Sequence, residues 1–203
     1  MQRYIKAARY PVWAAWAYVV AKKQGYHDRE AKSLAIAVAN LNAASKFYGP
    51  VGNFYPHLPK RDGSTRSYTG AVECVELLGR RIPVTIQNGE YVAVLRSKGK
   101  PRLVSPDDFD RKVIDRLGSA YRILIDLFEQ LADRFTPAEL NAKGYKLYAE
   151  NFAPTKEENG APVWDSKGRP VYPGRGVAGI VDLERIRRLA EKTEADAHAY
   201  ACV

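Results

Sequence analysis

The 203-residue sequence predicts a mostly helical α+β protein, and three observations support this fold class. Apolar residues recur at spacings of three and four over several long segments, which is typical of amphipathic helices. Two alternating segments flank Asn88-Gly89, the pair favoured in a tight β-hairpin turn. The composition, 46% hydrophobic and 11% aromatic, is sufficient for a packed core. Because no repeat or long linker interrupts the chain, we expect a single domain over residues 1–203, with a possible helical-hairpin subdomain at residues 1–49.

Two helices are predicted at the N-terminus. The first runs from Pro11, a good first-turn residue, to about Gln24, and Gly25 is the expected left-handed residue that follows it. The second helix runs from Asp28, the expected N-cap, to about Tyr48. The short connection between them predicts a helical hairpin.

The apolar run "PVWAAWAYVVA" within the first helix could be mistaken for a signal peptide. It lacks a convincing small-x-small cleavage site, and two lysines follow it directly. Eleven residues are also too few to span a bilayer. We therefore expect a buried helix and no membrane partner.

The middle of the chain carries the β signal. A short helix is predicted first, from about Thr69 to Leu78, ended by Gly79. The segments "IPVTIQ" and "EYVAVLRS" then flank Asn88-Gly89, and a second turn, "SKGK", leads to "PRLV". The sequence therefore predicts a three-stranded antiparallel meander.

A long helix is predicted after the meander, beginning at a capping-box-like Ser105-Pro106-Asp107-Asp108 and extending to Phe135. Gly118 is the expected position of a bend. Its apolar residues follow a heptad spacing and comprise Ile114, Leu117, Tyr121, Leu124, Phe128, Leu131 and Phe135. Two interpretations follow from this pattern: a central core helix, or a coiled coil that joins two copies of the chain.

The C-terminal part predicts two further helices and a hairpin. Thr136-Pro137-Ala138-Glu139 is a capping box that opens a helix to about Glu150. A hairpin with a turn at Asp165–Gly168 follows, and Asp182 caps a last helix whose end is expected to fray after Thr193.

Positive charge is concentrated in the first third of the chain. The net charge is +9, and residues 1–70 hold 11 Lys and Arg against 3 Asp and Glu. A basic region attracts polyanions, of which nucleic acid is the first candidate. A solvated face, or a face that meets an acidic protein, would have the same composition.

Two basic segments are the candidate contacts. The segment Lys46–Tyr68 combines four basic residues with five aromatic rings, so it offers both phosphate contacts and stacking surfaces. The turn Arg96–Arg102 holds four cations in seven residues, although basic turns also protect exposed strand edges. The candidate nucleic-acid-binding residues are Lys46, Tyr55, Lys60, Arg61, Arg66, Tyr68, Arg96, Lys98, Lys100 and Arg102.

Other motifs are weaker. The first two helices resemble a helix-turn-helix in spacing, but the second is too alanine-rich and apolar to read base edges. "GRGVAG", Gly174–Gly179, matches dinucleotide-binding spacing but lacks the strand and helix that this motif requires, so we expect a loop. A nuclease-like acid pattern at Pro106-Asp107, with Asp110 or Asp165, lies in unsuitable contexts.

Catalytic and metal signatures are also lacking. The three histidines stand singly, and two distant cysteines favour a reducing compartment. We expect no catalytic residue, no metal and no cofactor.

These observations favour a non-enzymatic, cytoplasmic protein that binds nucleic acid, DNA rather than RNA. The alternative is an assembly or adaptor subunit whose basic face binds an acidic protein. In that alternative the helix over residues 114–135 joins copies into a homo-oligomer.

Overall fold

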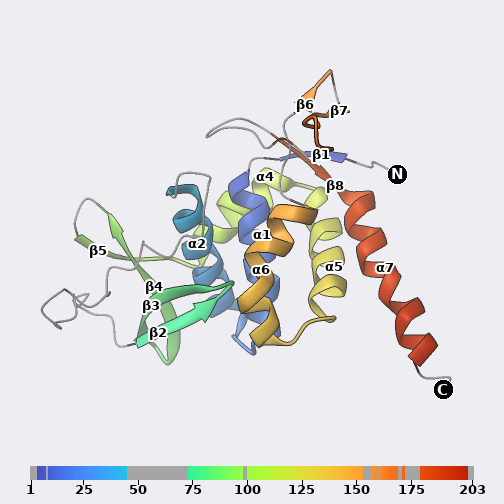
Figure 1. Cartoon of the computed structure of the whole chain (residues 1–203). Helices are drawn as coiled ribbons and strands as arrows, with labels where there is room; N and C mark the ends of the chain where they lie inside the picture. The colour runs from blue at the N-terminus through green and yellow to red at the C-terminus, as the bar shows by residue number, and fades with distance from the viewer. Residues whose placement is uncertain are drawn as a thin grey trace, which may run out of the picture.

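The computed structural model of the chain describes residues 4–7, 9–44, 73–97, 100–152, 157–159, 161–168, 171 and 179–200. It confirms the α+β, mostly helical class (Figure 1). A four-stranded sheet packs on helix α2, α2 packs on α1, and α1 packs on α5 and α6. Helix α7 covers α5 on the side away from the sheet.

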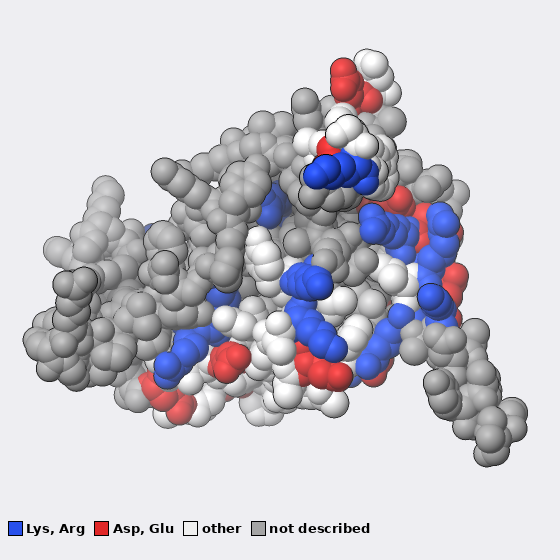
Figure 2. All heavy atoms as spheres, in the orientation of Figure 1, with Lys and Arg blue, Asp and Glu red and all other residues white. Residues whose placement is uncertain are grey.

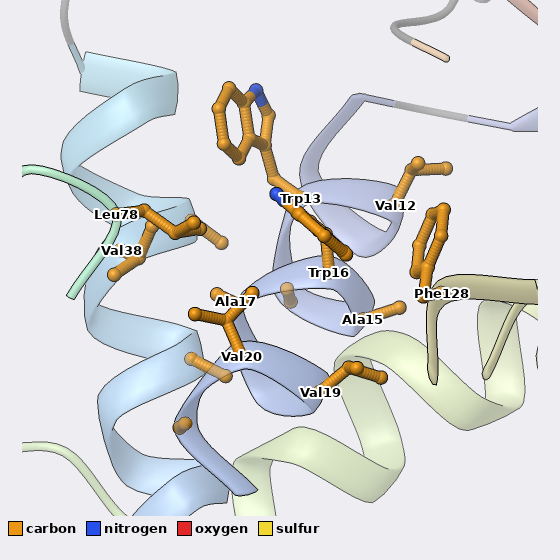
Figure 3. Close-up of a cluster of buried hydrophobic side chains, with 14 of the residues drawn as sticks. Val12, Trp13, Ala15, Trp16, Ala17, Val19, Val20, Val38, Leu78 and Phe128 are labelled. Carbon is orange, nitrogen blue, oxygen red and sulfur yellow. The ribbon is translucent and has the colours of Figure 1, made fainter. Parts of the chain in front are cut away.

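Helix α1 (Arg9–Lys23) is the centre of the fold. It is apolar on all sides, which is the pattern of a helix surrounded by protein. Figure 3 shows its two tryptophans, Trp13 and Trp16, between Val38 and Leu78 on one side and Phe128 on the other. The predicted buried helix is confirmed.

Helix α2 (Asp28–Ala44) completes the predicted helical hairpin. The expected N-cap is wrong by one position, because Asp28 is already helical. The backbone N–H of His27 donates to the carboxylate of Glu30 at 2.9 Å, which is the contact of a residue that precedes the first turn. Asp28 instead accepts a hydrogen bond from the Tyr18 hydroxyl at 2.7 Å. The predicted end at Tyr48 lies outside the described residues.

The sheet has four antiparallel strands in the order β2-β3-β4-β5 rather than the three predicted. Strands β3 (Arg80–Gln87) and β4 (Glu90–Ser97) join at Asn88 and Gly89. The φ angles of these two residues are 52° and 81°, so the predicted turn is confirmed. Strand β5 (Lys100–Leu103) pairs with β4 as expected.

The predicted helix over Thr69–Leu78 is wrong where the structure describes it. Residues Glu73–Leu77 form strand β2, paired with β3 from Glu73↔Val84 to Leu77↔Arg80. Pairing with a strong neighbouring strand overrides the weak local helix preference of this short segment. Residues 69–72 lie outside the described part.

One face of the sheet packs against α2. Its central residues Leu77, Ile82, Val84 and Ala93 are all 0% exposed. The register places them on the same face, because cross-strand partners share a face and residues two apart along a strand do so too.

Two polar side chains of α2 continue the hydrogen bonding of β4 where β5 ends. The Oγ of Ser33 accepts the backbone N–H of Ala93 at 3.0 Å and donates to the carbonyl of Val104 at 2.7 Å. The carboxylate of Glu30 accepts the backbone N–H of Tyr91 at 3.0 Å. Buried backbone donors that lack a strand partner are thereby satisfied.

The predicted single helix to Phe135 is wrong, because it is divided into several pieces. These are α3 (Asp107–Phe109), a π-helical turn η1 (Asp110–Ile114), α4 (Asp115–Leu117) and α5 (Ala120–Ala132). Gly118 separates the last two with φ 54° and ψ −131°, a conformation that favours glycine. The bend expected there is therefore a break. At the start of α3, the Oγ of Ser105 accepts the backbone N–H of Asp107 at 3.3 Å. The N-cap residue of α3 is Pro106, whose side chain makes no capping hydrogen bond.

The heptad residues nevertheless face the core. Leu124, Phe128 and Leu131 of α5 are fully or almost fully buried. Phe128 contacts Trp16 of α1 edge-on, with ring centroids 5.3 Å apart. The core-helix interpretation is confirmed, and a coiled coil would need these same side chains on the surface.

Helix α6 (Pro137–Asn151) begins at the predicted capping box. Thr136 donates its backbone N–H to Glu139 at 2.9 Å and accepts the Glu139 N–H at its Oγ1. Helix α6 adds Tyr148 to the aromatic core, stacked on Trp13 with centroids 3.6 Å apart.

Helix α7 (Leu183–Tyr200) is capped by Asp182 as predicted, whose Oδ1 accepts the Arg185 N–H at 3.1 Å. The helix extends to Tyr200, past Thr193, after which its end is expected to fray.

Two short strand pairings and a turn complete the described part of the fold. Strand β1 (Tyr4–Ala7) pairs with β8 (Gly179–Asp182), a contact between the chain ends that the sequence did not predict. Strand β6 (Glu157–Glu158) pairs with β7 (Ala161–Pro162). The turn at Asp165–Gly168 is confirmed by the Gly168 N–H bonded to the Asp165 carbonyl at 3.0 Å. Among the described residues, no helix has both the length and the apolar character needed to cross a bilayer.

Candidate nucleic-acid interface

The aromatic and basic segment Lys46–Tyr68 lies outside the described residues. The structure therefore does not test whether it contacts nucleic acid. The predicted contacts in this position are Lys46, Tyr55, Lys60, Arg61, Arg66 and Tyr68.

In the second predicted segment, Arg96 and Ser97 end β4, and Lys100 to Arg102 lie in β5. The register pairs Arg96 with Pro101, Ser97 with Lys100, and Leu95 with Arg102. Because paired residues share a face and neighbours alternate, Arg96 lies on one face and Lys100 and Arg102 lie on the other. Arg102 is exposed, and Lys98 lies outside the described residues. The register therefore places Arg96 on the opposite face from Lys100 and Arg102.

The cations of α1 and α2 are largely neutralised. Lys23 pairs with Asp133 at 3.2 Å. Arg29 lies 3.3 Å from Glu90 and 3.5 Å from Asp107. These acids come from distant parts of the chain, so the positive excess of the first third is partly balanced in three dimensions.

Lys32 is the most strongly held of these cations. Its ammonium lies 3.2 Å from both Asp28 and Asp110. Burial alone would lower the pKa of Lys32, but the hydrogen bonds and attraction of the two carboxylates raise it above the ordinary value. Burial would likewise raise the pKa of Asp28, yet the Tyr18 hydroxyl and Lys32 hold it below the ordinary value. Both groups therefore stay charged at neutral pH and support packing rather than ligand contact.

The aspartates of the nuclease-like pattern also make ion pairs or hydrogen bonds within the protein. Asp107 pairs with Arg29 and Asp110 pairs with Lys32. The Oδ1 of Asp165 accepts the backbone N–H of Lys167 at 2.9 Å. Within the described ranges, no three His, Cys, Asp or Glu side chains gather in a way that could hold a metal ion.

The helix-turn-helix comparison fails on burial. Residues 33–39 of α2 are all buried between α1 and the sheet. A recognition helix must expose polar side chains to a groove. The α1–α2 pair is therefore a structural hairpin.

A basic surface that sequence reasoning missed lies on α6 and α7. Lys143 and Lys146 are exposed on α6, and Arg188 and Lys192 are exposed on α7 beside the half-buried Arg185. Figure 2 shows Lys and Arg side chains over these two helices on one face, with acids between them. The signal for this surface on α7 is the segment "LERIRRLAEK", where cations recur at spacings of three and four and so share one face of a helix.

These cations differ from those of α1 and α2 in their pairing. Across the part of the chain that the structure describes, Lys143, Arg185, Arg188 and Lys192 make no ion pair with a carboxylate. Arg187, in contrast, pairs with Glu184 at 3.1 Å. On the described part of α6 and α7, the positive charge of Lys143, Arg188 and Lys192 is therefore exposed and not balanced by an ion pair.

No family model, no curated protein and no solved structure matches this chain.

Proposed function

We propose that the chain binds nucleic acid, DNA rather than RNA, through its phosphate backbone and catalyses no reaction. Binding would use the segment Lys46–Tyr68, the hairpin cations Lys100 and Arg102, and the surface over α6 and α7. The sparse cysteines favour a cytoplasmic location, which is part of the same proposal.

The observation that supports this function is the distribution of ion pairs. The net charge is +9. The structure pairs Lys23, Arg29 and Lys32 with carboxylates, yet leaves cations on α6 and α7 without such partners. Cations that are not balanced within the protein attract a polyanion at long range.

Duplex DNA is the favoured ligand because its charge is dense and regular. It carries one phosphate per about 1.7 Å of helix axis and holds condensed counterions that a basic protein displaces. The proposed contacts are to phosphates, which carry no sequence information, so we expect little sequence preference.

The test is a binding titration of a fluorescently labelled duplex at increasing salt concentration. For a protein that contacts phosphates, the logarithm of the binding constant should fall linearly with the logarithm of the salt concentration, with a slope of about −0.9 per contact. Polyglutamate serves as a competitor with charge but without the duplex geometry. If polyglutamate displaces the duplex at equal charge concentration, an acidic protein becomes the better partner and the DNA proposal is wrong.

A further inference from the structure

Helix α7 presents one face to the protein and the opposite face to solvent. Leu183, Ile186 and Ala190 are buried, and the helix packs on α5. With about 100° between successive residues, Arg185, Arg188 and Lys192 fall within an arc of about 60° opposite these buried side chains. We call these three residues the α7 stripe.

The helix that carries the stripe is held at two points. Asp182 caps its N-terminus through the Arg185 backbone N–H. The side chain of Arg134, which lies between α5 and α6, donates to the backbone carbonyl of Ala190. The backbone beneath the stripe is therefore anchored, so its cations keep a fixed spacing without reorganisation of the helix.

Acidic residues flank the stripe without cancelling it. Glu184 and Glu191 lie along one side of the helix, but Glu184 is paired with Arg187 at 3.1 Å. The three stripe cations make no ion pair with any described carboxylate. Among the α7 side chains that the structure describes, up to Lys192, the balance beside the stripe is therefore three unpaired cations against Glu191.

We propose that the α7 stripe contacts the phosphate backbone of duplex DNA, with the helix parallel to the duplex axis. This inference rests on the proposed function and assigns α7 as the helix that contacts the phosphates. A rise of about 1.5 Å per residue puts Arg185 and Lys192 about 10.5 Å apart along the helix axis. Measured along the duplex axis, one DNA strand advances about 3.4 Å per phosphate, so a helix parallel to that axis spans about three nucleotide steps. An acidic protein surface offers no such regular repeat.

The test compares two variants that lose the same charge. The stripe variant carries Arg185→Gln, Arg188→Gln and Lys192→Gln. The control carries Lys22→Gln, Arg116→Gln and Lys167→Gln, which are exposed cations on other parts of the protein. Circular dichroism confirms that both fold, and a labelled duplex is titrated between about 50 and about 200 mM salt, the range over which phosphate contacts weaken strongly.

For the stripe variant, the slope of the logarithm of the binding constant against the logarithm of the salt concentration should be about 2.7 less steep than for the wild type. This is about 0.9 for each of three lost contacts. Its affinity loss over this fourfold salt range should then be about 40-fold smaller than that of the wild type. The control should keep the wild-type slope, because charges beyond a Debye length of about 10 Å are largely screened. A variant with Arg185→Lys and Arg188→Lys keeps the charge and should also keep the slope.

Three results would overturn the inference, and they point to different errors. An unchanged slope in the stripe variant, with normal salt dependence in the wild type, means that α7 does not touch the phosphates although the chain still binds DNA. An equal loss in the control means that only the total charge matters. If the wild type binds no duplex at all, the proposed function itself is wrong.

Discussion

The side-chain oxygen of Ser33 on α2 accepts a hydrogen bond from the backbone N–H of Ala93 on β4, at 3.0 Å. The same hydroxyl donates to the carbonyl of Val104 at 2.7 Å. Ser33 is 0% exposed, so no solvent competes for these backbone groups. The Ser33 hydroxyl on α2 thus bridges the backbones of β4 and of Val104, the residue that follows β5.

Ser33→Ala should therefore lower the free energy of unfolding by about 1–3 kcal/mol, because it leaves a buried donor and a buried acceptor unsatisfied. Urea unfolding followed by circular dichroism measures the change. The matched control is Ser119→Ala, an exposed serine whose side chain makes no capping hydrogen bond. Equal stability of the two variants would contradict the structural role given to Ser33.

Leu78 and Gly144 form a second tight contact, between the β2–β3 turn and α6. A Cβ at position 144 would lie 2.3 Å from the Leu78 Cδ2. Leu78 has φ 54°, which is unfavourable for leucine, and its side chain is almost fully buried. Packing against α6 offsets the backbone strain and explains why an apolar residue occupies a turn position that usually holds asparagine.

Gly144→Ala should destabilise the protein by about 1–3 kcal/mol through overpacking, although alanine is the better helix former by about 1 kcal/mol. Leu78→Ala alone should cost about 2–5 kcal/mol. In the double variant the two costs should fall short of their sum, because the shortened side chain makes room for the new Cβ. Strictly additive costs in denaturant melts would show that the two residues do not interact.

Leu124→Lys should unfold the domain rather than separate an oligomer. Leu124 is 0% exposed, and removing its packing and burying an ammonium group should cost about 4 kcal/mol or more. Ile123→Lys, at the exposed neighbouring position, should change stability by less than about 1 kcal/mol. Light scattering and circular dichroism together distinguish the two outcomes. A folded Leu124→Lys monomer derived from a wild-type dimer would instead support the assembly-subunit alternative.

Stability should fall in acid because two aspartates have a lowered pKa in the folded state. Burial would raise the pKa of Asp28 and Asp108, but for Asp28 the Tyr18 hydroxyl and Lys32 outweigh it, and for Asp108 Lys112 and Arg111 do so. Their contribution is complete above the unfolded pKa of about 3.9 and is lost as the pH falls through the folded values. The melting temperature should therefore change little until about pH 4 and then drop. The double variant Asp28→Asn/Asp108→Asn should show a shallower acid drop, and an identical drop would rule out this cause.

Local signals in the sequence predicted much of the helical part of the fold. Pro137 with its capping box, Asp182, and the Asn88-Gly89 turn each act through contacts with near neighbours, so a single sequence contains the information. The heptad spacing also identified the core side of α5 correctly, even though Gly118 breaks the helix. The apolar side chains of α5 are buried in the core even though the backbone of the predicted helix is divided into α3, η1, α4 and α5.

Features that depend on distant partners were missed. The segment Glu73–Leu77 has no strong strand pattern and becomes β2 only because β3 pairs with it. Strands β1 and β8 are four residues each and lie at opposite ends of the chain. The pairing of charges could not be predicted either, because Arg29 forms ion pairs with Glu90 and Asp107, which are far from it in the sequence.

We propose that this chain binds duplex DNA through phosphate contacts, and the salt dependence of duplex binding is the measurement that decides between binding and no binding. A plot of the logarithm of the binding constant against the logarithm of the salt concentration should be straight, with a slope of about −2.7 or steeper, because the α7 stripe implies at least three phosphate contacts. Affinity that does not change with salt, or the absence of measurable duplex binding at low salt, would contradict it.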